Sequence, residues 1–126
     1  LGGGVLTGKY NVSPPPGARF TDYLLNGEER QRKMAERFVN DRTIETTRRM
    51  EEIAKSIGTT VTALAVAWSR QHDFVASTII GATSTEQLLE SLAARDLVLD
   101  SETLARIDQV DVEIPTPMTE DGLRRL

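Results

Sequence analysis

The chain has 126 residues, of which 39% are hydrophobic and 27% charged, and this length and composition can bury one globular core and argue against a disordered chain. Its 15 Lys and Arg residues against 19 Asp and Glu residues give a net charge of −4, so no overall positive field attracts nucleic acid or an anionic membrane. Cysteine is absent and His72 is the one histidine, which excludes disulfides, Cys nucleophiles and thiolate or histidine-rich metal sites.

The first 27 residues predict a long loop with a short turn, because they hold most of the glycine and the three prolines from Pro14 to Pro16. Loops of this length usually serve a site. The chain opens on Leu1 and three glycines without an initiating Met, so we expect it to be a fragment. No apolar run approaches the roughly 20 residues of a membrane span, and no membrane partner is expected.

Three helices are predicted next. The first covers residues 28–40, and its narrow buried stripe consists of Met34, Ala35, Phe38 and Val39. The second has Asp41 as its N-cap and ends before Gly58, with apolar positions that step by three or four residues. The third follows Thr60 as N-cap and is apolar on nearly all sides, so we expect Trp68 to lie in the core.

Residues 74–80 are short, rich in β-branched side chains and almost unbroken in hydrophobicity, which predicts one complete buried parallel strand at about residues 75–80. A helix follows, opened by Thr83 and Ser84 in a doubled capping-box pattern. Its inner stripe is predicted to be Leu88, Leu89, Leu92 and Ala93. Asp100 or Ser101 caps a last helix whose inner residues are Leu104, Ile107 and Val110.

The order helix, strand, helix is typical of α/β architecture, although most of the predicted elements are helical. A buried strand needs hydrogen-bonding neighbours on both sides, and this chain supplies none. We therefore expect a severed α/β barrel or sheet whose other strands lie upstream or in another chain.

Two segments carry residues suited to an anionic ligand. Gly3 to Lys9 fits the start of a P-loop, G-x-x-x-x-G-K, but Tyr10 stands where a P-loop needs Ser or Thr for Mg²⁺. The alternative is a Gly-rich turn with a solvent-facing lysine. In both interpretations the three glycines let the backbone approach a ligand closely, and Lys9 and Arg19 supply cations.

The second segment runs from Ile79 to Gln87, where a strand end, a glycine, small hydroxyl residues and a helix N-terminus form an anion-binding corner. In α/β barrels the loop after the last strands is a frequent phosphate site. The alternative interpretation is that Thr83 and Ser84 only cap the helix.

Together these segments resemble the aldo-keto reductase superfamily. Leu1 to Tyr10 is similar to the family's "PLGGGLLTGKY" stretch after the seventh barrel strand, and Thr60 to Arg70 to its "T.aqlAlaW" helix. Ser77 to Leu88 is similar to the family's last strand and the loop "IpGasseeQl". The resemblance covers residues 1 to about 112, within the branch that holds bacterial oxidoreductases and potassium-channel β subunits.

The resemblance implies an NADP(H)-dependent cytoplasmic oxidoreductase on a (β/α)₈ TIM barrel, which reduces a small-molecule aldehyde or ketone to an alcohol by hydride transfer. The chain would be the C-terminal segment of one barrel domain and would need the N-terminal part. Residues 1–27 would be the cofactor-covering loop, 28–112 the helices and last strand, and 113–126 a tail. The family's Asp, Tyr, Lys and His tetrad would lie upstream, so no catalytic residue is expected here.

The resemblance also assigns the cofactor-binding residues. Leu1, Gly2 and Gly3 would line the pyrophosphate, with Lys9 and Arg19 as cationic clamps. The residues around the adenosine end would be Gly81, Thr83, Gln87, Glu90 and Ser91, the last standing where the family commonly has Asn.

Two other function classes stay open: a non-enzymatic nucleotide-binding regulatory subunit, and a half-barrel interaction module that assembles with a second chain or with itself. A homo-oligomer is among the assemblies that these classes allow.

Overall fold

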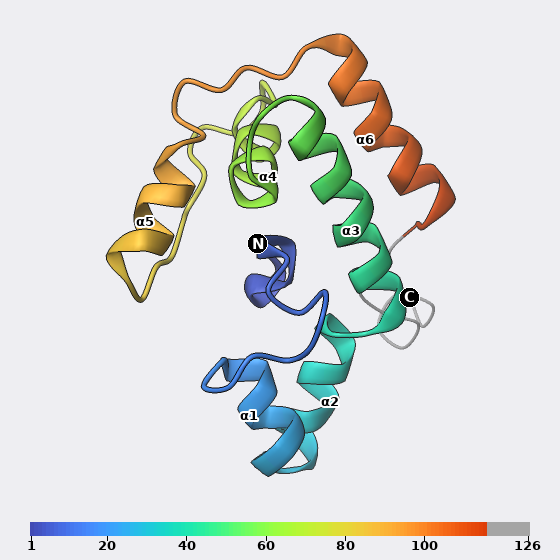
Figure 1. Cartoon of the computed structure of the whole chain (residues 1–126), viewed down its shortest axis with the longest axis vertical. Helices are drawn as coiled ribbons and strands as arrows, with labels where there is room; N and C mark the ends of the chain where they lie inside the picture. The colour runs from blue at the N-terminus through green and yellow to red at the C-terminus, as the bar shows by residue number, and fades with distance from the viewer. Residues whose placement is uncertain (116–126) are drawn as a thin grey trace.

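A computed structural model describes residues 1–115, and over this range the chain is helical with no β-strand. Its elements in chain order are the 3₁₀ helix η1 (Gly2–Thr7) and the α-helices α1 (Arg19–Asn26), α2 (Glu29–Phe38), α3 (Asp41–Ser56), α4 (Val61–Arg70), α5 (Thr85–Leu92) and α6 (Ser101–Glu113). Figure 1 shows α1 and α2 as a hairpin at one end of the molecule and α3 beside α6. The 3₁₀ helix η1, in dark blue, lies between this hairpin and α4 and also contacts α3. The mostly helical expectation is confirmed.

Three helix ends follow the prediction. The Thr60 hydroxyl accepts the Ala63 N–H at 3.1 Å at the start of α4, and the Asp100 carboxylate accepts the Thr103 N–H at 2.8 Å at the start of α6. Gly58 adopts φ 72° just after α3, as a glycine in the C′ position does.

Asp41 as the N-cap of α3 is wrong. The cap is Asn40, whose side-chain oxygen accepts the N–H groups of Arg42 and Thr43 at 3.0 and 3.1 Å. Its own N–H donates to the Thr43 hydroxyl at 3.1 Å, which completes a capping box. Asp41 lies in the first turn instead, where its carboxylate complements the positive end of the helix.

Buried apolar side chains form two clusters. The larger one joins α3, α4 and α6 and consists of Ile53, Ala54, Val61, Ala63, Leu64, Val66, Ala67, Ala94, Leu99, Ile107 and Val110. The smaller one joins η1, the residues after it, α1 and α2, and consists of Val5, Tyr10, Phe20 and Ala35. The glycine-rich segment therefore has a core of its own, separate from the core of the three long helices.

The prediction of a loop through residue 27 is wrong for Arg19–Asn26, which forms α1. Phe20 and Thr21 are buried on this helix, while Asp22 and Leu25 face outward. The three prolines and Gly17 end just before this segment, so the composition of the loop obscured an eight-residue amphipathic helix behind it.

The buried strand at 75–80 is wrong for this structure. The segment is extended, but residues 76–82 make no backbone–backbone hydrogen bond within the described part of the chain, and Phe74 and Ile79 are 85% and 96% exposed. The pattern of hydrophobicity was that of a strand, but a strand needs ladder partners. The described residues offer none.

The same missing neighbours explain two further departures. Trp68, predicted to be in the core, is 39% exposed on α4. On α5 the predicted inner stripe also faces outward: its exposed members are Leu88, Leu89, Leu92 and Ala93. On α6, by contrast, Ile107 and Val110 are buried and Leu104 packs against the main cluster, as expected. Most of the tail predicted for 113–126 lies outside the described residues.

The cap of α6 gives a pH dependence. The Thr103 N–H and hydroxyl hold the pKa of Asp100 below its usual value of 3.8. A lowered pKa contributes stability above the unfolded-state value, and this contribution is lost as the pH falls through the folded-state pKa. We expect the thermal midpoint of the wild type to drop more between pH 7 and pH 3 than that of Asp100→Asn, whose amide oxygen still caps the helix. Equal drops in the two proteins would contradict this assignment.

Candidate functional site

The glycine run folds into a tight turn at the start of η1. Gly2, Gly3 and Gly4 have φ values of 56°, 64° and 94°, in the left-handed region that side-chain-bearing residues rarely adopt. The Leu1 carbonyl closes the turn by accepting the N–H groups of Gly4 at 3.0 Å and Leu6 at 3.2 Å. Three successive residues of this geometry are accessible to glycine alone, so the sequence dictates the shape of the turn.

The side chains of Lys9 and Arg19 both lie against this turn. A Cβ placed on Gly4 would lie 2.9 Å from Lys9 Nζ, and one placed on Gly3 would lie 3.1 Å from Arg19 Nη2. Neither cation forms an ion pair with a carboxylate of the described residues. The structure therefore brings Lys9 and Arg19 beside the glycine turn, and no carboxylate of the described residues neutralises either charge.

The residues that follow Lys9 anchor the turn to α3. Asn11 Nδ2 donates to Glu51 Oε2 at 3.2 Å, and Arg48 Nη2 donates to the Asn11 carbonyl at 2.7 Å. The Lys55 ammonium, 3.1 Å from Glu51 Oε1, is the main reason that the pKa of Glu51 lies below its usual value. A carboxylate that stays ionised thus holds the Asn11 end of the loop in place.

The residues predicted around the adenosine end form a second group at the start of α5. Gln87 Oε1 accepts the N–H and the hydroxyl of Thr83 at 3.0 and 3.2 Å, and the Ser84 hydroxyl caps the helix by accepting the Gln87 N–H at 3.4 Å. The Gln87 Nε2 hydrogens have no partner among the described residues, so the amide can still donate to a ligand. Thr83 and Gln87 therefore lie together at the surface, on the corner that the sequence indicated.

Three other predicted residues lie on or beside the same helix. Gly81 is exposed with open space around it, and Glu90 is half-buried. Ser91 is buried, and its hydroxyl donates to the Gln87 carbonyl at 3.0 Å. Because the Ser91 hydroxyl is bound back to its own helix, it has little reach toward a ligand.

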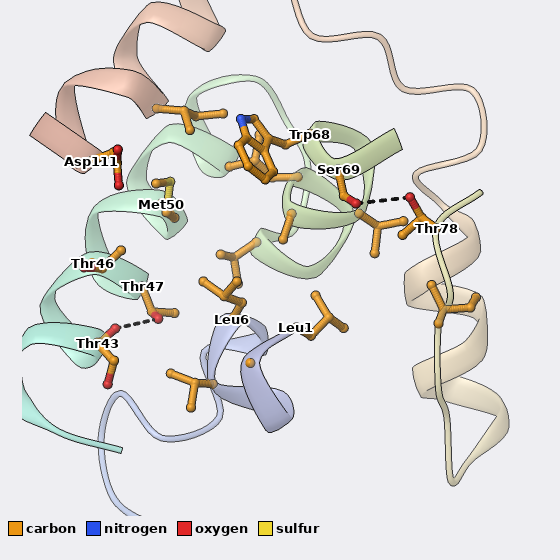
Figure 2. A pocket seen from close by; sticks show the side chains of 18 of the residues that line it. Leu1, Leu6, Thr43, Thr46, Thr47, Met50, Trp68, Ser69, Thr78 and Asp111 are labelled. Carbon is orange, nitrogen blue, oxygen red and sulfur yellow. Dashed lines mark hydrogen bonds between the residues drawn. The ribbon is translucent and has the colours of Figure 1, made fainter. Parts of the chain in front are cut away.

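The two groups are not joined directly. α4 contacts both η1 and α5, and no hydrogen bond or ion pair of the described residues links 1–19 to 81–91. Beside α4 lies a cavity of about 730 Å³, lined by parts of η1, α3, α4, α6 and the extended segment 77–80. Figure 2 shows Leu1, Leu6, Met50 and Trp68 around this cavity. Among the predicted residues only Leu1 and Gly2 line it.

The types of polar and charged side chain present indicate which ligands this region can bind. No cluster of three or more metal-ligating side chains occurs in residues 1–115, and no helix of this range is long and apolar enough to cross a membrane. Segment 81–91 carries Glu86 and Glu90 but neither Lys nor Arg. The described residues can therefore bind an anion at the glycine turn. At the start of α5 they can form hydrogen bonds with a ligand through hydroxyl and amide groups.

The sequence analysis missed Phe20, whose ring contacts both Gly3 and the Arg19 guanidinium. Phe20 is 0% exposed, and its ring fills the space beside Gly3. The signal was present as two cation–aromatic dipeptides, Lys9-Tyr10 and Arg19-Phe20, in each of which the cation lies over the ring of the next residue.

Comparison with known proteins shows where this chain belongs. Residues 1–112 match the model of the Aldo/keto reductase family. The chain is 33% identical over 114 residues to the "Putative voltage-gated potassium channel subunit beta" of Schizosaccharomyces pombe, covering 87% of this chain and 31% of that protein. It is 36% identical over 117 residues to "Protein tas" of Escherichia coli, covering 87% and 30%.

A third relative is the "L-glyceraldehyde 3-phosphate reductase" of Escherichia coli, 30% identical over 110 residues, which cover 86% of this chain and 31% of that protein. The chain thus spans about a third of the length of each of these relatives.

Proposed function

Because this chain belongs to the aldo/keto reductase family, we propose that it carries the cofactor-binding surface of an NADP(H)-dependent reductase of small-molecule aldehydes or ketones. The bound nicotinamide would supply the hydride that converts the carbonyl to an alcohol. The convergence of Lys9 and Arg19 on the glycine turn is the observation that carries the proposal.

The glycine turn fits a pyrophosphate. A diphosphate needs cations and a close approach to the backbone, and Gly2, where the nearest atom to the position of a Cβ lies at 4.0 Å, leaves the backbone open at the start of the turn. Lys9 and Arg19 provide the cations, since neither charge is neutralised by a carboxylate of the described residues. In our proposal Leu1 borders the same ligand from the start of the turn.

The adenosine end would lie at the start of α5. Thr83 and Gln87 would bind through hydroxyl and amide groups, Glu90 would accept from the ribose or base, and Gly81 and Ser91 would border the site. Because segment 81–91 has no cation, the preference for NADP(H) over NAD(H) rests on the family and needs a direct comparison.

We assign no catalytic acid to this chain. Tyr10 carries a hydroxyl group, which in other settings can donate a proton to a carbonyl oxygen. Here the residue is buried in the smaller cluster, and this burial raises the pKa of its hydroxyl. We propose that the chain is the C-terminal segment of a single cytoplasmic barrel domain. The apolar cavity beside α4 and the unpaired segment 77–80 support packing against further barrel elements.

Titration with NADPH, followed by nucleotide fluorescence, tests the proposal. The proteins are this chain and the longest reading frame that contains it, with NADH as the comparison. We expect Lys9→Ala to raise the Kd for NADPH about tenfold or more in the longer protein, because hydrogen bonds to charged groups contribute about 1.5–3 kcal/mol. Gln87→Ala should raise it about fivefold, because a hydrogen bond between neutral groups contributes about 1 kcal/mol.

Matched controls come from the same chain. Lys33→Ala removes an exposed lysine on α2, and Gln109→Ala an exposed glutamine on α6. Neither control should change the Kd. If the longer protein binds neither nucleotide, the reductase proposal fails and an interaction module takes its place.

A second candidate is a nucleotide-binding regulatory subunit, favoured by the name "channel subunit beta" carried by the fission yeast relative. Tight NADPH binding without consumption of NADPH in the presence of a panel of aldehydes and ketones would favour this candidate.

A further inference from the structure

Phe20 occupies a fixed position at the centre of an aromatic group. Its ring stacks on Phe38 of α2 with a centroid separation of 5.3 Å and an angle of 15° between planes. The rings of Tyr10 and Tyr23 lie at 6.2–6.3 Å from it, at tilted angles. With neighbours on several sides and no exposure to solvent, the ring has little freedom to move.

The same ring contacts both halves of the proposed pyrophosphate site. A Cβ placed on Gly3 would lie 2.3 and 2.5 Å from two carbon atoms of Phe20, so the ring occupies the space that any other residue at position 3 would need. The guanidinium carbon of Arg19 also lies 4.8 Å from the ring centroid, within the range of a cation–π contact.

Apart from the contact with Phe20, no polar group of the described residues fixes the position of the Arg19 guanidinium. Among the described residues its guanidinium forms neither a hydrogen bond nor an ion pair. A long side chain held only by solvent would have to lose its rotational freedom when the ligand binds. Because contact with the Phe20 ring already restricts the Arg19 side chain in the free protein, less conformational entropy is lost when the ligand binds.

We infer that Phe20 is a positioning residue, which holds the guanidinium of Arg19 beside the glycine turn and so sets the affinity of the site for a diphosphate. This inference rests on the proposed function and adds to it a residue that touches neither nucleotide nor substrate. It assigns the α1–α2 hairpin a role in binding: α2 supplies Phe38, Phe38 fixes Phe20, and Phe20 orients Arg19.

A double-mutant cycle tests the inference in the longest reading frame that contains this chain. Phe20→Leu keeps a buried apolar side chain but removes the flat face, and we expect it to raise the Kd for NADPH about tenfold. In the Arg19→Ala background the same substitution should change the Kd less than twofold, because the group that Phe20 orients is gone. Equal effects in the two backgrounds would overturn the inference.

Arg19→Lys provides a variant that does not disturb the core. Lysine keeps the positive charge but lacks the planar group that stacks on Phe20. We expect Arg19→Lys to bind NADPH almost as weakly as Arg19→Ala. Binding by Arg19→Lys at the wild-type level would show that charge alone matters, and would also overturn the inference even if Phe20→Leu fails to fold.

The controls separate this inference from general destabilisation and from the proposed function. Ile107→Val lowers stability in the other apolar cluster and should leave the Kd unchanged. A wild-type protein that binds no nucleotide refutes the proposed function and the inference with it. A wild-type protein that binds NADPH and is weakened by Arg19→Ala, but shows no coupling to Phe20, refutes the inference alone.

Discussion

Gly3→Ala is expected to lower the free energy of unfolding by roughly 3 kcal/mol or more. Two causes add. At φ 64° an alanine is strained by about 1–2 kcal/mol. Its Cβ would also lie 2.3 Å from Phe20 Cε2, and the buried ring, stacked on Phe38, has little room to shift. The urea-unfolding midpoint measures the loss.

Gly17→Ala is the matched control. Gly17 has φ 73°, but no atom lies within 4 Å of the position that its Cβ would take. This variant therefore carries the backbone strain without the collision and should cost only about 1–2 kcal/mol. If the two variants were equally destabilised, the contact with Phe20 would have no part in fixing the glycine. We further expect Gly3→Ala, unlike Gly17→Ala, to weaken NADPH binding.

Gln71→Ala is expected to cost about 2–4 kcal/mol, because it removes two hydrogen bonds to buried backbone groups. Gln71 Nε2 donates to the Leu99 carbonyl at 2.6 Å, and the Leu99 N–H donates to Gln71 Oε1 at 2.8 Å. The amide thereby acts as a strand neighbour would, and attaches the connector before α6 to the end of α4. Leu99 is buried, so truncation leaves both backbone groups without a partner. Thermal or urea unfolding measures the change.

Gln109→Ala serves as the control, because the Gln109 amide donates to Glu113 at the exposed end of α6. Its loss should change stability by less than about 0.5 kcal/mol. Gln71→Glu refines the test: the carboxylate keeps the acceptor but repels the Leu99 carbonyl, and protonation at acidic pH restores a donor. A Gln71→Glu variant that stays equally destabilised at every pH would argue against the paired arrangement.

Features that depend on residues three or four apart were predictable from the sequence. Thr60, Asp100 and Gly58 act within one turn of a helix, so their roles follow from local chemistry alone. The N-cap of α3 was predicted wrongly as Asp41, because Asn and Asp side chains can both cap a helix and the two residues are adjacent. It is the capping box between Asn40 and Thr43 that selects Asn40.

Features that depend on distant neighbours were not predictable in this way. Residues 75–80 and Trp68 have the composition of buried segments, but burial requires partners that the described residues do not include. In the candidate site the resemblance indicated Lys9 and Arg19, and the family match confirms that resemblance. Their convergence depends on α1, which the loop pattern concealed, and the roles assigned to the cofactor-binding residues remain predictions.

The extended segment 76–80 has a practical consequence for handling the protein. Its row of unpaired N–H and C=O groups lies beside β-branched side chains, without a proline or a lysine to block pairing. Such an edge is a template for strand addition between molecules, which leads to aggregation as concentration rises. Association of the short chain with itself in solution is therefore to be expected from non-specific edge pairing, and its concentration dependence must be known before any oligomer is read as a native assembly.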